Sequence, residues 1–204
     1  MAMPDDATTP KGIIFWDLAG TVLTRDGAKG HIVSLAGFAE AMTALQTRYA
    51  IHLTTSDDTD SARDLLRSMN LLQCFHGVHG NFRVGTGKPY GELATELDVP
   101  PESCLAIGDN LYSDVPADSD RVVTVLINQE GFTLHAAIIA ALVELLESRG
   151  ESLCAGYEAL FAAAQPLPDS DPPLRQNLDG IECFMFYFEH RALNAPRPVI
   201  LLPG

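Results

Sequence analysis

Short hydrophobic runs alternate with amphipathic segments along most of this chain. The runs near 12–17, 50–55, 104–109 and 121–127 have no helical period and end at polar or glycine positions. This pattern is typical of strands that are buried on both faces of a sheet. Between the runs, hydrophobic residues recur every three or four positions, as they do in the segment 36–48. That spacing predicts helices that each bury one face.

Strands that alternate with helices predict an α/β fold, specifically a Rossmann-like, doubly wound parallel sheet. The segment TVLTRDGAKGHIVSL, which follows the first strand, contains two glycines and several charges and predicts a hairpin-like flap. We expect three parts in the chain: a loose tail over 1–10, a core over 11–150, and a C-terminal extension over 151–204. In the extension we expect a helix near 152–165, a proline-rich linker PLPDSDPPL, and two strands near 181–190 and 197–203.

Four segments carry side chains that can take part in catalysis or ligand binding. Asp17 ends the first hydrophobic run, in GIIFWDLAGTVL, and the other segments are LTTSDD (53–58), GTGKPY (85–90) and LAIGDNLYSD (105–114). Open α/β sheets bind ligands at the carboxyl ends of their strands. We therefore expect a hydroxyl, a lysine and several carboxylates to converge at that edge.

In their order and spacing, these segments resemble the haloacid dehalogenase-like superfamily of phosphohydrolases, over roughly residues 10–130. The resemblance identifies Asp17 with the nucleophile, and it matches the later motifs to Thr55, to Lys88, and to Asp109 with Asp114. The chain has only three lysines, so we expect the lysine in the GTGKP loop to have a role beyond that of an ordinary surface residue. Neither interval in which the family inserts a cap domain has room for one here, and the chain resembles a capless, minimal-core member.

The resemblance implies a Mg²⁺-dependent phosphatase that forms an aspartyl-phosphate on Asp17, with Lys88 as the second catalytic residue. The implied metal ligands are Asp17, the backbone carbonyl of Ala19, Asp109 and Asp114. The implied substrate-binding residues are Gly20, Thr55, Ser56, Lys88 and Asn110.

Ala19 is the one departure from the family's pattern. Phosphatases of the family have the sequence DxDGT, and their second acid protonates the leaving group and activates water; here that position is Ala19. Such acid–base help contributes about 10²- to 10⁴-fold in rate. We therefore expect slow turnover of alkyl esters unless Asp26 or His31, both in the flap, supplies the proton.

Two other functions remain open from the sequence. The pattern DxAGT resembles phosphonoacetaldehyde hydrolase, which cleaves a carbon–phosphorus bond through an imine on a lysine of its cap. This chain has no such cap, and Lys29 in the flap is the only spare candidate for that lysine. Alternatively, the loss of the acid and of any cap fits a non-catalytic domain that binds phosphate, metal or a protein partner. Retention of Asp17 and of the other matched motif residues weighs against a loss of catalytic function.

The net charge of −14 argues against nucleic acid or an anionic membrane surface as a partner. It also means that a phosphate substrate needs a divalent cation beside the acids. No segment of the sequence resembles a signal peptide or a membrane span, and the cysteines form no CxxC pair, so we expect a cytoplasmic protein with reduced thiols. The expected partner is a small phosphorylated substrate. The aromatic C-terminal extension predicts either an extra edge hairpin that completes the core or the interface of a homodimer.

Overall fold

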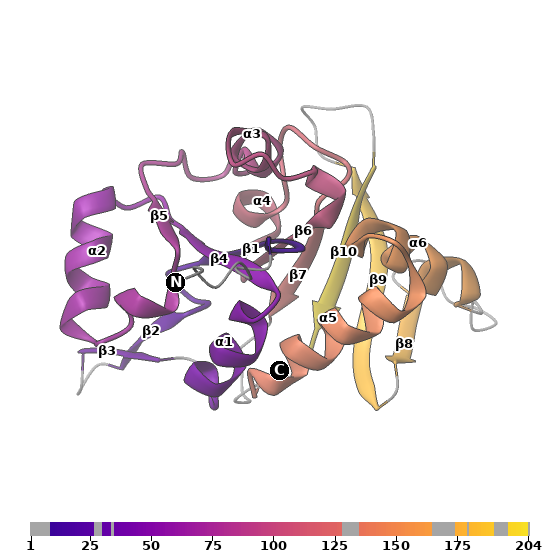
Figure 1. Ribbon diagram of the computed structural model, residues 1–204, viewed down its shortest axis with the longest axis horizontal. Helices are drawn as coiled ribbons and strands as arrows, with labels where there is room; N and C mark the ends of the chain where they lie inside the picture. The colour runs from indigo at the N-terminus through magenta and orange to yellow at the C-terminus, as the bar shows by residue number, and fades with distance from the viewer. Residues whose placement is uncertain are drawn as a thin grey trace, which may run out of the picture.

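A single eight-stranded sheet lies at the centre of the part of the chain that the computed structural model describes (Figure 1). The described residues are 9–26, 30–33, 35–127, 135–164, 174–178, 180–189 and 196–203. The sheet strands are β1 (Gly12–Asp17), β4 (Tyr49–Thr54), β5 (Gly77–His79), β6 (Cys104–Gly108), β7 (Val123–Ile127), β8 (Leu174–Leu178), β9 (Ile181–Glu189) and β10 (Pro196–Leu202).

The strand order is β5-β4-β1-β6-β7-β10-β9-β8. The strands from β5 to β10 in this order run parallel, whereas β9 and β8 are antiparallel to their neighbours. From β1, the chain first builds outward to β4 and β5 and then returns to add β6 and β7 on the other side. This is a doubly wound arrangement, and it confirms the predicted Rossmann-like α/β fold.

Helices cover both faces of the sheet, with α1 and α5 on one side and α3 and α4 on the other (Figure 1). The α-helices are α1 (Phe38–Gln46), α2 (Thr59–Ser68), α3 (Tyr90–Glu96), α4 (Leu111–Asp114), α5 (Ala137–Arg149) and α6 (Leu153–Ala163). Two 3₁₀ turns lie at Leu72–Cys74 and Pro101–Ser103. The predicted flap is an antiparallel pair of strands, β2 (Leu23–Asp26) and β3 (Gly30–Val33).

Strand β1 shows why the first hydrophobic run has no alternation of polar and apolar residues. Ile14 and Trp16 belong to the large core on the α1 and α5 side, while Ile13 and Phe15 pack with Tyr90 on the α3 side. All four β1 side chains are at most 1% exposed. A central strand that is buried on both faces must be hydrophobic throughout.

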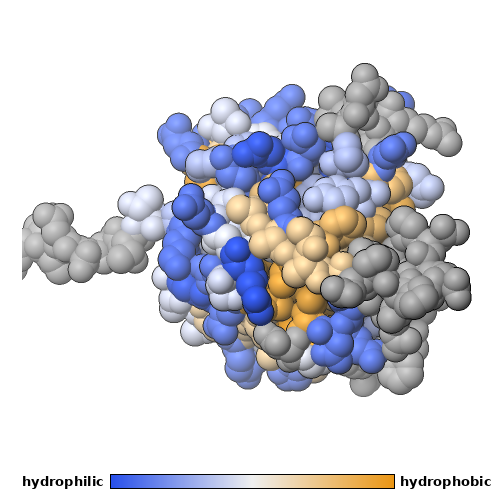
Figure 2. All heavy atoms as spheres, turned by 90° about the vertical axis from the view of Figure 1, so that its right-hand side faces the viewer, coloured by the Kyte–Doolittle hydropathy of each residue, from blue (hydrophilic) through white to orange (hydrophobic). Residues whose placement is uncertain are grey.

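The C-terminal extension continues the sheet of the core. Strand β10 pairs in parallel with β7, and Cys183 and Met185 of β9 are fully buried in the large core. Strand β8 was not expected from the sequence, because its residues LRQNL are mostly polar and it lies at the sheet edge. Figure 2 faces this end of the molecule and shows hydrophobic side chains gathered among polar ones. The homodimer through the extension stays a prediction.

Within the described part of the chain, no helix has both the length and the apolar character needed to cross a membrane.

Tyr157 links α6 to the two inner strands of the extension. Its hydroxyl donates to the carbonyl oxygens of Phe186 at 2.7 Å and Val199 at 3.3 Å, and its side chain is fully buried. We predict that Tyr157→Phe lowers the free energy of unfolding by about 1–2 kcal/mol, since buried carbonyls lose a donor. Urea unfolding measures this loss, with Tyr187→Phe, on an exposed side chain of β9, as the control. Equal midpoints for the two variants would contradict the prediction.

Candidate active site

Asp17 and Asp109 lie at the point of the sheet where the strand order reverses. Asp17 is the last residue of β1, and Asp109 directly follows β6, which pairs in parallel with β1. The carboxyl ends of these strands therefore bring both acids to the same edge. In doubly wound sheets this switch point is where ligands bind.

Three carboxylates meet at this edge. Asp17, Asp109 and Asp114 each offer an oxygen, and these oxygens lie within 4.8 Å of one another. Asp17 is 8% exposed and Asp114 is 1% exposed, while Asp109 is exposed. It is the one group of three or more acid, histidine or cysteine ligands in the described part of the chain. Buried carboxylates at this spacing need a positive charge between them.

Lys88 supplies one such charge from the loop before α3. Its Nζ donates to Asp17 Oδ1 at 2.5 Å and to Asp114 Oδ1 at 2.7 Å, and its side chain is 4% exposed. Burial opposes the charged ammonium, but Tyr90, Asp17 and Asp114 together raise the pKa of Lys88 above its usual value. Lys88 therefore stays protonated and binds the two acids together.

The electrostatics of Asp17 differ from those of a surface carboxylate. Burial raises the pKa of Asp17 to about 7, and the neighbouring charges of Asp114 and Asp109 act in the same direction. The charge and hydrogen bond of Lys88 oppose that rise. Lys88 alone therefore does not bring the pKa of Asp17 back to its usual value, and a further positive charge at the site would lower it.

The segment GDNLYSD folds around its last acid. Asp114 Oδ2 accepts from the backbone amides of Asp109 at 3.1 Å and Asn110 at 3.0 Å. Asn110 caps α4, because its Oδ1 accepts from the amides of Tyr112 and Ser113. Both oxygens of Asp114 are therefore already engaged, one by Lys88 and one by these amides.

Two glycines make room for the acids. Gly20 has φ of +85°, and a Cβ there would lie 2.0 Å from Asp109 Oδ2. A Cβ on Gly108 would lie 2.2 Å from Asp114 Cγ. The glycines that end the runs FWDLAG and LAIG are thus required by the close approach of the carboxylates.

The acids open into a cavity of about 210 Å³. It is lined by nearly all the residues that the sequence analysis assigned to the site, namely Asp17, Ala19, Thr55, Ser56, Lys88, Asp109, Asn110 and Asp114. Gly20 is the exception and lines a neighbouring cavity. Thr55 is 1% exposed, and its Oγ1 accepts from the amide of Asp57 at 3.1 Å.

Four further residues line the cavity and were not predicted from the sequence: Phe82, Arg83, Val84 and Ser113. Arg83 is exposed and adds a second cationic side chain to the lining. The only signal for it was its place shortly before the GTGKP loop. Ser113 could have been inferred, because it lies in a short helix between two residues of the site.

Ala19 lines both this cavity and the neighbouring one, which has a volume of about 330 Å³. His31 of the flap and Asp57 also line the neighbouring cavity. Of the two candidate proton donors, His31 is thus close to position 19, and the side chain of Asp26 lies outside the described residues. Asp57 is a third candidate proton donor, and it was not predicted from the sequence.

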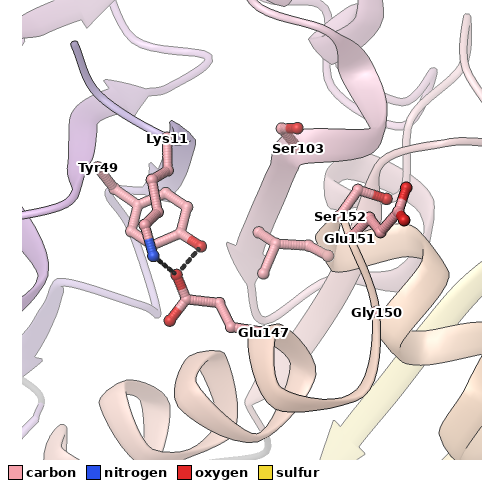
Figure 3. Close-up of a pocket in the computed structure, with 8 residues that line it drawn as sticks. Lys11, Tyr49, Ser103, Glu147, Gly150, Glu151 and Ser152 are labelled. Carbon is pink, nitrogen blue, oxygen red and sulfur yellow. Dashed lines mark hydrogen bonds and ion pairs between the residues drawn. The ribbon is translucent and has the colours of Figure 1, made fainter.

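A further cavity of about 330 Å³ lies at the opposite, amino-terminal edge of the strands. There Lys11 Nζ and the Tyr49 hydroxyl both donate to Glu147 Oε1, at 3.1 and 3.0 Å (Figure 3). These bonds tie the starts of β1 and β4 to α5. The cavity is a seam between elements, in which Lys11 and Tyr49 are already paired with Glu147.

The fold and the acid cluster together define a Rossmann-like α/β protein with a carboxylate–lysine site at its switch point. The family model of the haloacid dehalogenase-like hydrolases matches residues 12–117, which is more than half of the chain. The chain therefore belongs to the haloacid dehalogenase-like hydrolase family.

A solved structure of a HAD-superfamily hydrolase from Ehrlichia chaffeensis is similar at 12% identity, with a TM-score of 0.47. The match covers 66% of this chain and 98% of that chain. No curated protein matches the chain.

We predict that Lys88→Met destabilises the protein by about 3–5 kcal/mol, because two buried carboxylates lose their cation. Chemical denaturation measures the loss. Lys11→Met is the control: that lysine is exposed and pairs with Glu147, so its loss should change stability by about 1 kcal/mol or less.

The double variant Lys88→Met/Asp114→Asn should recover part of the stability, since it removes one of the unpaired charges. If the double variant were less stable than Lys88→Met alone, charge repulsion would not be the cause.

Proposed function

We propose that this chain is a Mg²⁺-dependent phosphohydrolase that acts on phosphomonoesters through Asp17. One observation carries the proposal: Asp17 ends the central strand and shares a small cavity with Lys88, Thr55 and two further acids. A carboxylate nucleophile, a fixed cation and hydroxyl or amide donors are the parts that phosphoryl transfer requires. Four free cysteines fit the cytoplasmic location that we propose with it.

The donor set fits Mg²⁺, which prefers oxygen ligands and binds through one or two carboxylates. We assign Asp17 and Asp109 as direct ligands, and the resemblance to the family adds the backbone carbonyl of Ala19. Asp114 belongs to the metal-binding set as well, but its two oxygens hold Lys88 and two backbone amides. We assign it mainly to positioning. The bound cation would supply positive charge that keeps Asp17 ionised and offsets charge on the phosphate.

In the proposed reaction, a carboxylate oxygen of Asp17 attacks phosphorus, and the ester P–O bond breaks with its electrons leaving on the departing oxygen. Lys88 balances the charge that develops near Asp17. Thr55 and Ser56 contribute donors to the phosphate oxygens, and Asn110 can do so only through its amide nitrogen, since its oxygen caps α4. Water then hydrolyses the aspartyl-phosphate and restores the carboxylate.

The alternative of a carbon–phosphorus hydrolase needs a lysine that can form an imine. Lys88 is buried in two ion pairs, and Lys11 lies with Glu147 at the opposite edge of the strands. Lys29 lies outside the described residues. Neither described lysine favours this reaction, so we rank it below ester hydrolysis, as we do a non-catalytic binding role.

We predict that Mg²⁺ raises the melting temperature of the protein by mass action, because it binds the folded acid cluster and not the unfolded chain. A thermal scan with increasing Mg²⁺ measures the shift. Asp109→Asn should lose most of it, while Asp98→Asn, a change outside the site, should keep it. An equal shift in wild type and Asp109→Asn would remove the acid cluster as the binding site.

We predict that the wild type hydrolyses aryl phosphates far faster than alkyl phosphates, because phenolates leave without protonation and no acid stands at position 19. Ala19→Asp should raise kcat/KM for an alkyl phosphate by up to about 10²- to 10⁴-fold. Steady-state assays with p-nitrophenyl phosphate and glycerol phosphate measure both effects.

Ala19→Asn is the matched control, since it has nearly the same shape and no proton to give. Asp17→Asn provides the inactive blank. Comparable wild-type rates on the two esters would instead assign the proton to His31, Asp57 or another group.

A further inference from the structure

We propose that the C-terminal extension builds a binding subsite for an aromatic leaving group beside the phosphate site, so that the substrates are phosphate monoesters of phenols. The subsite is a cavity of about 760 Å³ that adjoins the acid cavity. Its aromatic walls are Tyr112 of α4 and Phe188 of β9. The inference rests on the proposed function for the orientation of the substrate.

The two cavities share part of their lining. Val84, Asn110 and Ser113 line both of them, so an ester whose phosphate lies at Asp17 can extend its organic group into the larger cavity. Hydrogen bonds fix the intervening loop against α4: the amide of Gly87 donates to the Tyr112 carbonyl at 2.8 Å, and that of Gly85 to Ser113 Oγ at 3.3 Å. The subsite is therefore largely formed before a ligand binds.

Apolar surface is concentrated here. Among the described residues, five large hydrophobic side chains are exposed, and two of them, Val84 at 71% and Tyr112 at 61%, line this cavity. The Tyr112 and Phe188 rings lie edge to face, with centroids 6.0 Å apart. A third ring inserted between these walls and Val84 would find both apolar contact and aromatic partners.

Charge restricts what the leaving group can be. Glu189 lines the cavity, and none of its described lining residues is cationic. An anionic leaving group, such as a nucleoside polyphosphate, would meet this carboxylate, and no described lining residue of the cavity offsets the repulsion. An uncharged phenol meets no such penalty.

Ala19 independently favours the same substrates. Without an acid at that position, the departing oxygen leaves unprotonated, which a phenolate does far more readily than an alkoxide. The missing acid at position 19 and the aromatic cavity beside Phe188 lie in different parts of the chain, and both favour phosphate esters of phenols.

The test compares phenyl phosphate with acetyl phosphate in the presence of Mg²⁺. Both have good leaving groups, but only the first carries a ring. Tyr112→Ala and Phe188→Leu should raise KM for phenyl phosphate about three- to tenfold with little change in kcat, and should leave acetyl phosphate unaffected. Tyr187→Ala is the control, because Tyr187 packs against Phe161 on α6 and does not line the cavity. Equal effects on both substrates would overturn the subsite.

A binding measurement separates this inference from the proposed reaction. Calorimetry should show that benzylphosphonate, which cannot be hydrolysed at an ester, binds more tightly than methylphosphonate, and that Tyr112→Ala removes the difference. Tyr112 is mostly exposed, so the variant should keep the fold, which its melting temperature verifies. If that preference is found but no ester is turned over, the subsite stands and the phosphatase proposal fails. If the two phosphonates bind equally, the subsite is wrong whatever the activity.

Discussion

The candidate site depends on the ion pairs that Lys88 makes with Asp17 and Asp114. Two buried carboxylates at the end of a hydrophobic strand would repel each other and resist burial if no cation were present. Lys88 reaches both from a different element, so the position of the loop before α3 is coupled to that of β1 and of α4. The backbone amides on Asp114 then fix the segment that carries Asp109. Charge balance at the sheet edge thus determines the local structure of three loops.

That edge exists because the sheet is doubly wound, and the C-terminal extension adds strands to the sheet beyond β7. Strand β10 continues the parallel sheet beyond β7, and β9 returns beside it in the opposite direction. The odd-numbered side chains Cys183 and Met185 complete the core on the α6 side, whereas Phe186 and Phe188 of the same strand pack on the other face with Val115 of the segment after α4. The strand that completes the core therefore also brings an aromatic ring next to α4.

The sequence predicted the parallel sheet and the convergence of the acids because both follow from local rules. Hydrophobic runs mark central strands, and residues at their carboxyl ends must meet at one edge. It failed where local signals were weak or where position depends on distant packing. The polar edge strand β8 carries no hydrophobic pattern, and Phe188 lies about 170 residues from Asp17 in the chain, so no spacing rule could place it near the site. The hydrogen bonds that both Asp114 oxygens accept could not be predicted either, because a motif gives residue types and not hydrogen bonds.

Ala19 and the aromatic cavity bear on different parts of the reaction. In the proposed reaction, the missing acid raises the barrier to P–O cleavage more for a more basic leaving oxygen, so it acts on the chemical step. Additional contacts with the leaving group cannot replace the proton that an acid at position 19 would donate. Contacts with Tyr112 and Phe188 exist before and during bond cleavage, so they strengthen binding of the ground state and the transition state alike and lower KM without raising kcat. If the proposed reaction holds, a site with both features would be specific for phenolic esters without being a strong general phosphatase. The acid cavity and the aromatic cavity share Asn110 and Ser113, so the segment that carries Asp114 also separates the proposed phosphate position from the proposed leaving-group position.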